Sequence, residues 1–168
     1  MNNNKELNNN KITKILFVCL GNICRSPAAE GVMRKMLEER GLGKWIAVES
    51  AGVGGWHVGE LPDRRMRRCA FERGYNLTSR AQQFDKDSFS RFDFIVVMDN
   101  DNYMAVNRMA SNKEDRLKVL QMKDYFIRYK GCCSVPDPYY GDDDDFNYAL
   151  DLIEDGCEGL LIHKILKE

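Results

Sequence analysis

Blocks of apolar and polar residues alternate along the chain and predict strands and helices in turn. Four apolar runs predict strands: the continuous runs Ile12–Val18 and Phe94–Met98, and the weaker runs Ile46–Ser50 and Leu117–Leu120. Apolar residues at helical spacing predict these helices: Pro27–Glu39, Pro62–Arg73, Asp101–Met109, Phe146–Leu166 and a short one over Lys86–Ser90. This alternation is typical of an α/β single domain with a four-stranded, parallel, twisted sheet that has helices on both faces.

The segment from Cys19 to Ser26 follows the first predicted strand and precedes a predicted helix. A sharp turn is expected at Gly21, and Ser26 is expected to cap a helix whose first position is Pro27, where a missing N–H is tolerated. The backbone N–H groups of such a loop and the positive end of the helix dipole attract an anion. Ligands of open α/β sheets bind beyond the carboxyl ends of the strands, so we predict a phosphate site here.

Cys19 and Arg25 supply the reactive groups of this loop. A thiol beside a helix N-terminus and a cation ionises more readily than a free thiol, so we expect Cys19 to be largely thiolate at neutral pH. The planar guanidinium of Arg25 is spaced to hold two phosphoryl oxygens, which lysine cannot do. The Cys-x5-Arg pattern arises often by chance, and its place between a strand and a helix gives it weight. The pattern predicts in-line attack of sulfur on phosphorus.

Two motifs carry a family resemblance: VCLGNICRSP at Val18–Pro27 and DPYY at Asp137–Tyr140. With them the chain resembles the low-molecular-weight protein tyrosine phosphatases from about Ile12 to the C-terminus. The resemblance implies a flavodoxin-like phosphatase fold without cofactor or metal. It also implies hydrolysis of phosphotyrosine and small aryl phosphates in two steps through a cysteinyl-phosphate. By this resemblance Cys19 is the nucleophile, Arg25 binds phosphate and stabilises the transition state, and Asp137 is the general acid.

Physical chemistry supports an acid and an aromatic slot for this reaction. Expelling a phenol, whose pKa is about 10, requires a proton donor in the transition state, and Asp137 on a loop can provide it. The alternative is that Asp137 and Pro138 merely open a turn. An aryl phosphate needs a deep slot with aromatic walls and an apolar rim. The residues predicted to bind the substrate are Leu20, Gly21, Asn22, Ile23, Cys24, Ser26, Trp56, Tyr139 and Tyr140.

The resemblance adds residues that support the loop. Asn22, Ser26 and Ser50 look like the family network of hydrogen bonds that fixes the loop and helps stabilise the thiolate. Asp99 is expected to cap the helix that follows the strand Phe94–Met98. The resemblance gives it only a structural role in supporting the site. Related arginine phosphatases carry threonine where Ile23 stands, so isoleucine favours tyrosine as substrate.

One segment departs from the family pattern. Many members have a histidine near Ser79 and an arginine near Gln82, and this chain has neither. We therefore expect Ser50 and Asn22 alone to support the thiolate.

Cys24 lies in the same loop as Cys19. Structural disulfides are rare in cytosolic proteins, whereas a reactive thiolate with a second thiol nearby is typical of a reversible redox sensor. The resemblance favours this role: peroxide would oxidise Cys19, and Cys24 would capture it as a disulfide until reduction. The alternative is that Cys24 only packs under the loop.

Composition limits the classes of function. The chain has 168 residues, 43% of them hydrophobic, and a net charge of −1, which suits one domain over residues 12–168 after a disordered, asparagine-rich tail over residues 1–11. We find no secretory leader and no membrane-length apolar run, and expect a cytoplasmic protein. The arginines of the second predicted helix are spread around it and indicate a solvated face: Arg64, Arg65, Arg67 and Arg68. The acidic run Asp142–Asp145 suits the start of a helix.

The expected partners are tyrosine-phosphorylated proteins and inorganic phosphate or other oxyanions, with no nucleic acid and no membrane. The cysteines and histidines show no zinc-ligand spacing. Two alternatives share the loop. An arsenate reductase would need a third cysteine about seventy residues further on, where none lies, and a phosphate-binding module would leave Cys19, Arg25 and Asp137 without a task.

Overall fold

A computed structural model describes residues 11–168, so the predicted tail over residues 1–11 lies, apart from Lys11, outside the described residues. Four strands form one parallel sheet: β1 (Thr13–Cys19), β2 (Ile46–Gly52), β3 (Phe94–Val97) and β4 (Val119–Gln121). Their order is β2-β1-β3-β4. The predicted four-stranded parallel sheet is therefore confirmed. Because β1 lies between β2 and β3, the direction of connection reverses at its carboxyl end, where Cys19 is the last residue.

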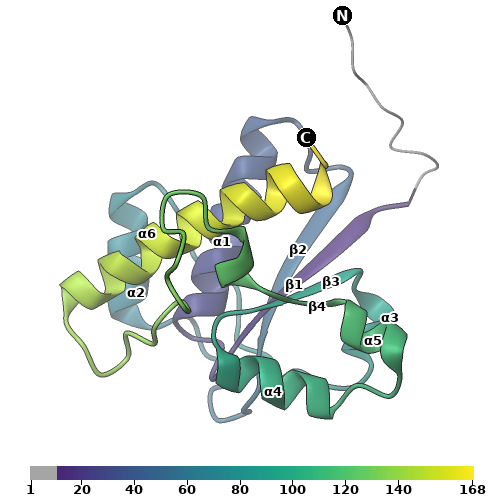
Figure 1. Ribbon diagram of the computed structural model, residues 1–168. Coiled ribbons are helices and arrows are strands. Elements are labelled where there is room, and N and C mark those ends of the chain that lie inside the picture. The colour runs from purple at the N-terminus through teal and green to yellow at the C-terminus, as the bar shows by residue number, and fades with distance from the viewer. Residues whose placement is uncertain (1–10) are drawn as a thin grey trace, which may run out of the picture.

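Helices cover both faces of the sheet, as expected (Figure 1). One face carries α1 (Arg25–Glu39), α2 (Arg64–Glu72) and α6 (Asp143–Gly159). The other face carries α3 (Ser88–Arg91), α4 (Asn100–Arg108) and α5 (Lys113–Leu117). The 3-10 turn η1 (Met122–Tyr125) follows β4, and the π-helical segment η2 (Leu160–Ile165) continues α6. None of the helices within residues 11–168 is long and apolar enough to cross a membrane.

The first strand is apolar throughout because both of its faces are covered. Ile15 and Phe17 pack in the core beneath α1 and α6, whereas Leu16 and Val18 pack in the core on the α3 and α4 side. Each of these side chains is at most 1% exposed. A strand with one solvated face would alternate apolar and polar residues instead. The continuous apolar run therefore predicted a strand correctly, and the structure shows that this strand is buried on both faces.

The first helix begins earlier than expected. It starts at Arg25 rather than Pro27, and no side chain caps it at Cys24. Ser26 was expected to be that cap, and this prediction was wrong. Its hydroxyl lies 3.0 Å from the Cys19 sulfur and accepts a hydrogen bond from Asn22. The side chain therefore serves the loop instead of the helix end.

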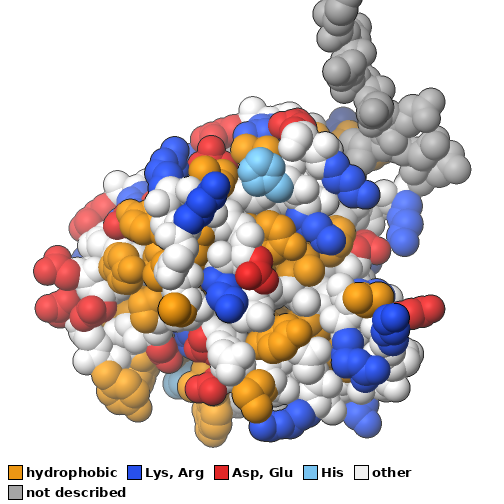
Figure 2. All heavy atoms as spheres, viewed as in Figure 1, with side chains coloured by type: hydrophobic (Ala, Val, Ile, Leu, Met, Phe, Trp, Pro, Cys, Tyr) orange, Lys and Arg blue, Asp and Glu red, His pale blue; other side chains and the backbone are white. Residues whose placement is uncertain are grey.

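Two other boundaries are set by local capping. The predicted strand at Leu117 is wrong at its first residues, because Asn112 accepts a hydrogen bond from the Asp115 N–H and starts the short helix α5. The last helix begins at Asp143 rather than Phe146, since the side chains of Asp142 and Asp145 form a capping box. Acidic side chains gather at the left edge of the molecule, over the start of α6 (Figure 2). The expectation that this acidic run serves a helix start is confirmed.

Candidate active site

A cavity of about 300 Å³ opens at the carboxyl end of β1. Its lining combines sulfur, guanidinium, carboxyl and aromatic groups: Cys19, Leu20, Gly21, Ile23, Cys24, Arg25, Trp56, His57, Asp137, Tyr139 and Tyr140. The structure thus brings the three predicted catalytic residues and the three predicted aromatic walls to one place. Asn22, Ser26 and Ser50 are buried and lie outside this lining.

The outer part of the cavity is aromatic and exposed. The side chains of Trp56 and Tyr140 are 69% and 96% exposed, and Tyr139 is less so. The rings of Tyr139 and Tyr140 meet edge to face with centroids 5.0 Å apart. The guanidinium of Arg65 lies 5.5 Å from the Tyr139 ring centroid and steadies it. Exposed rings around a buried sulfur suit a flat, apolar group whose charged end reaches the floor.

His57 also lines the cavity and was not predicted from the sequence. Its Nδ1 lies 2.8 Å from Glu60 Oε2. A Cβ added at Gly21 would lie 3.2 Å from the His57 ring, so the ring lies against the loop from Cys19 to Ser26. The sequence contains one indication of this role: His57 directly follows Trp56, which was predicted to line the cavity, so both residues lie on the same loop.

Asn22 holds the loop in its unusual conformation. Its φ of 57° lies in the left-handed region, which asparagine tolerates better than most residues. Its Nδ2 donates to Ser26 Oγ over 2.8 Å and to Ser50 Oγ over 2.9 Å. Because Ser26 accepts from Asn22, its own proton is available to the Cys19 sulfur at 3.0 Å or to the Ala51 carbonyl at 3.3 Å. The Ser26 hydroxyl is therefore placed to donate a hydrogen bond to the Cys19 sulfur.

Gln82 completes this network. Its backbone N–H donates to Asn22 Oδ1 over 2.9 Å, and its Nε2 donates to the Ser50 carbonyl over 2.9 Å. The expectation that Ser50 and Asn22 alone support the thiolate was wrong, because the side chain beside the Cys19 sulfur is Ser26, and Gln82 helps to hold Asn22 and Ser50 in place. The sequence carried no signal for the first of these bonds, because every residue except proline offers a backbone N–H.

Arg25 is the most deeply placed charge of the site, with an exposed fraction of 2%. Its Nη1 donates to Asp99 Oδ2 over 2.5 Å and to the Val135 carbonyl over 3.0 Å, and its Nη2 lies 3.5 Å from Asp137 Oδ2. Burial opposes the charge, but the neighbouring Cys19 and Asp99 more than offset it and raise the pKa of Arg25. The cation is therefore fixed in place and permanently charged.

Asp99 serves two elements at once. Its Oδ1 accepts from the Asn102 N–H over 2.8 Å and caps α4, which confirms the predicted cap. Its Oδ2 holds Arg25, and this contact was missed in the sequence. The two residues are far apart in the chain, and only the order of the strands brings them together.

Asp137 lies on the segment between η1 and α6. Two residues before it, the Val135 N–H donates to the Met98 carbonyl over 2.9 Å, which ties this segment to the end of β3. Asp137 Oδ1 accepts from the Tyr139 N–H over 3.2 Å. Its side chain is 37% exposed, so it can exchange a proton with water.

Cys24 is buried, with 4% exposure, and lines the same cavity as Cys19. Burial, together with the negative charges of Asp63 and Cys19, raises the pKa of the Cys24 thiol. This sulfur is therefore protonated at neutral pH. Within residues 11–168 no group of three or more histidine, cysteine or acidic side chains is arranged to hold a metal ion.

Comparison with known proteins identifies the family. Residues 14–168 match the family model described as low molecular weight phosphotyrosine protein phosphatase. A putative low molecular weight protein-tyrosine-phosphatase of Synechocystis sp. is 46% identical over 148 residues, which cover 88% of this chain and 94% of that protein. The low molecular weight phosphotyrosine protein phosphatase of Sus scrofa is 39% identical over 153 residues, which cover 90% of this chain and 96% of the relative.

A solved structure agrees with these matches. The crystal structure of a protein tyrosine phosphatase from Entamoeba histolytica has a TM-score of 0.87 and 41% sequence identity, and the match covers 90% of this chain and 96% of that one. The chain therefore belongs to the low molecular weight phosphotyrosine protein phosphatase family, and it is a phosphatase enzyme. The predicted family and fold are confirmed, and the two alternatives drawn from the sequence are not supported.

Proposed function

We propose that this protein hydrolyses phosphotyrosine in proteins, and small aryl phosphates, through a cysteinyl-phosphate formed on Cys19. The observation that carries this proposal is the single cavity shared by the Cys19 sulfur, the Arg25 guanidinium and the Asp137 carboxyl under an aromatic rim. The substrate ring would stand between Trp56 and Tyr139, with its phosphate over the loop.

In the first step the Cys19 thiolate attacks phosphorus and the bond to the phenolic oxygen breaks. Asp137, protonated at this stage, gives its proton to the leaving oxygen, so tyrosine departs as a neutral phenol. The equatorial oxygens of the transferring group bind Arg25 and the loop N–H groups, which are already fixed before substrate arrives.

In the second step water attacks the phosphorus of the cysteinyl-phosphate. The Asp137 carboxylate takes a proton from that water, the sulfur–phosphorus bond breaks, and inorganic phosphate and the Cys19 thiolate are formed. Ser26, beside the sulfur, stabilises the returning thiolate. Both steps balance without a metal or other cofactor.

The comparisons support this choice of substrate. The Entamoeba histolytica enzyme holds Hepes in its active site. Hepes carries a sulfonate, a tetrahedral oxyanion like phosphate, so inorganic phosphate and similar oxyanions are expected ligands of Cys19 and its loop. The absence of nucleic-acid and membrane partners stays a prediction. A cytoplasmic location is part of the proposal, because Cys19 must stay reduced to act.

The substitution Cys19→Ser tests the proposal. We expect it to abolish turnover of p-nitrophenyl phosphate and of a phosphotyrosine peptide, while inorganic phosphate still raises the melting temperature of the variant. The matched control is Cys133→Ser, since Cys133 is exposed and lies outside the cavity. Turnover retained in Cys19→Ser would reject the nucleophile.

Reversible redox control through Cys24 belongs to the same proposal. Peroxide converts the Cys19 thiolate to a sulfenic acid, and the Cys24 sulfur then displaces its hydroxyl group, giving a disulfide and water. A dithiol restores both thiols. We expect dithiol to restore activity after peroxide in the native chain and in Cys133→Ser, and to fail in Cys24→Ser. Equal recovery in all three proteins would remove Cys24 from this role.

A further inference from the structure

A second cavity, of about 640 Å³, lies along α2 and shares no lining residue with the catalytic cavity. We name it the α2 groove. Its lining mixes basic and apolar side chains: Leu61, Arg64, Arg67, Arg68, Phe71, Glu72, Asn76, Leu77 and Thr78.

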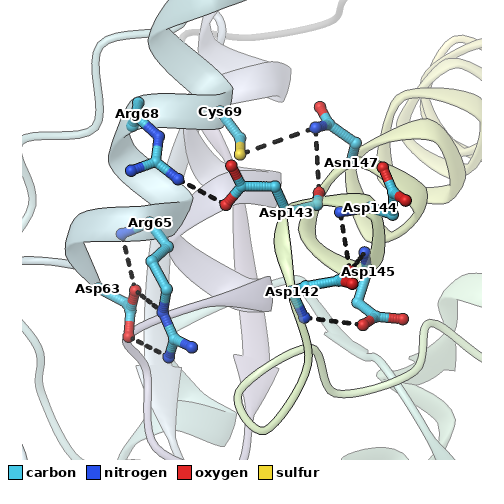
Figure 3. A network of polar contacts seen from close by, with 9 residues as sticks. All are labelled: Asp63, Arg65, Arg68, Cys69, Asp142, Asp143, Asp144, Asp145 and Asn147. Carbon is cyan, nitrogen blue, oxygen red and sulfur yellow. Dashed lines mark hydrogen bonds and ion pairs between the residues drawn. The ribbon is translucent and has the colours of Figure 1, made fainter.

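The sequence predicted that the arginines of α2 are spread around the helix, but three of the four lie on one side of it. Arg64, Arg67, Arg68 and Phe71 recur at helical spacing and line the one groove. Arg65 is the exception, because its guanidinium is held by the Asp63 carboxylate, away from Arg68 (Figure 3). The expected spread around the helix was therefore wrong, whereas the expected solvated face is present, because Arg64 and Arg68 are exposed.

Two of these cations are available to a ligand. Arg68 is paired with Asp143 of α6 over 2.5 Å (Figure 3). Among residues 11–168 neither Arg64 nor Arg67 has an ion-pair partner, and Arg67 uses only its Nε, on the Pro62 carbonyl at 2.9 Å. Glu72 is the acidic residue of the lining. The groove therefore presents a local excess of positive charge on a chain whose net charge is −1.

The lining of the groove is also partly apolar. Phe71 is 71% exposed, which is unusual for a phenylalanine on a surface helix, and Leu61 is 37% exposed. The buried Leu77 lies in the same lining. A ligand that satisfies this surface must bring an apolar side chain as well as negative charge.

The position of α2 connects this groove with the catalytic loop. The backbone N–H of Asp63, which caps α2, donates to the Ile23 carbonyl over 2.7 Å. A nine-residue helix is about 14 Å long, a distance that about four extended residues span. A peptide whose phosphotyrosine enters the catalytic cavity can therefore reach the α2 groove with residues four or more positions away.

We infer that the α2 groove binds an acidic segment of the phosphoprotein substrate, with its carboxylates on Arg64 and Arg67 and an apolar side chain on Phe71. The inference rests on the proposed function, since it names a substrate feature. A peptide fits better than a nucleic acid, because the lining includes the apolar side chains Leu61, Phe71 and Leu77, which a phosphate backbone would leave unsatisfied.

The test compares two phosphotyrosine peptides that differ only beyond the fourth residue from the phosphotyrosine. One carries Glu-Leu-Glu there and the other Ser-Ser-Ser. We expect the double variant Arg64→Glu/Arg67→Glu to raise KM for the acidic peptide about tenfold, and to leave kcat for that peptide and kcat/KM for p-nitrophenyl phosphate unchanged. Phe71→Ser, which leaves the charge of the groove unchanged, should also raise KM for the acidic peptide.

The matched control is Arg108→Glu/Arg116→Glu, which makes the same change of charge with exposed arginines of α4 and α5. An equal rise of KM in this control, or no rise in the α2 variant, would overturn the inference. So would tight binding of a single-stranded oligonucleotide that Arg64→Glu/Arg67→Glu abolishes. Failure of the proposed function shows separately, as native protein without p-nitrophenyl phosphate turnover.

Discussion

Arg25 Nη1 donates to Asp99 Oδ2 over 2.5 Å and so joins the first turn of α1 to the residue that caps α4. The Val135 carbonyl accepts a second bond from the same nitrogen over 3.0 Å. The guanidinium is therefore aimed before any ligand binds. A cation fixed in this way stabilises developing charge without the cost of reorientation.

Replacing Asp99 separates its two tasks. Asparagine is as good a helix cap as aspartate, so Asp99→Asn should keep the melting temperature while it removes the charged partner of Arg25. We expect kcat/KM for p-nitrophenyl phosphate to fall about tenfold, which corresponds to roughly 1.4 kcal/mol. Steady-state kinetics and a thermal melt measure both effects. Unchanged kcat/KM would show that the Val135 carbonyl suffices to hold Arg25.

The acid role of Asp137 makes its loss depend on the leaving group. Asp137→Asn cannot donate a proton to the phenolic oxygen, so kcat for phenyl phosphate should fall by roughly 10²–10⁴-fold. An ester with a strongly acidic phenol needs little protonation and should lose far less. Rates across a series of substituted phenyl phosphates give the comparison. An equal loss for every ester would assign Asp137 another task.

Gly52, the last residue of β2, lies against the loop from Cys19 to Ser26. A Cβ placed there would lie 2.8 Å from the Gly21 carbonyl carbon and 2.9 Å from the Asn22 nitrogen, and neither backbone atom can yield alone. A shift of about 1 Å in catalytic geometry can cost roughly 10²-fold in rate, so we expect a loss of that order in kcat/KM for Gly52→Ala.

Gly43→Ala is the control for Gly52→Ala, because a Cβ at Gly43 meets nothing within 4 Å. It should leave the kinetics of p-nitrophenyl phosphate hydrolysis unchanged. Comparable losses in the two variants would show that the loop does not depend on this contact.

The buried carboxyl of Glu30 makes the free energy of unfolding depend on pH. Burial raises the pKa of its carboxyl above the ordinary value, although Ser79 and Arg34 favour the charged form. The folded state thus binds this proton more tightly than the unfolded state does. Its contribution to stability is therefore present at acidic pH and is lost as the pH rises through the ordinary glutamate range and the raised folded value.

Glu30→Gln removes this titration. The free energy of unfolding, measured by urea denaturation, should increase in the variant relative to the native chain as the pH rises from acidic to neutral. Glu38→Gln, on the exposed side of the same helix, is the matched control. A constant difference between Glu30→Gln and the native chain would contradict the shift.

What the sequence revealed depends on how local each feature is. The apolar run through Phe17, the cap at Asp99 and the loop from Cys19 to Arg25 are written in neighbouring residues, and the structure shows each as expected. The role of Asp99 as partner of Arg25 needs the strand order, which no local pattern contains.

The failures have the same physical origin. The hydroxyl of Ser26 could either cap a helix or contact a sulfur. It lies beside the Cys19 sulfur and accepts a hydrogen bond from Asn22, so it does not cap the helix. Gln82 joins the network mainly through a backbone N–H, which has no residue signature. The arginines of α2 could be placed correctly only once the face covered by α6 was known.

The central claim is that sulfur at the end of β1 accepts the phosphoryl group. Rapid acid quench of the native enzyme during turnover of p-nitrophenyl phosphate, followed by mass spectrometry of its peptides, measures this most directly. We expect one phosphoryl group on the peptide that contains Cys19, and its loss when turnover ends. A phosphoryl group on a different residue, or none on Cys19 while nitrophenol is released in a burst, would contradict the claim.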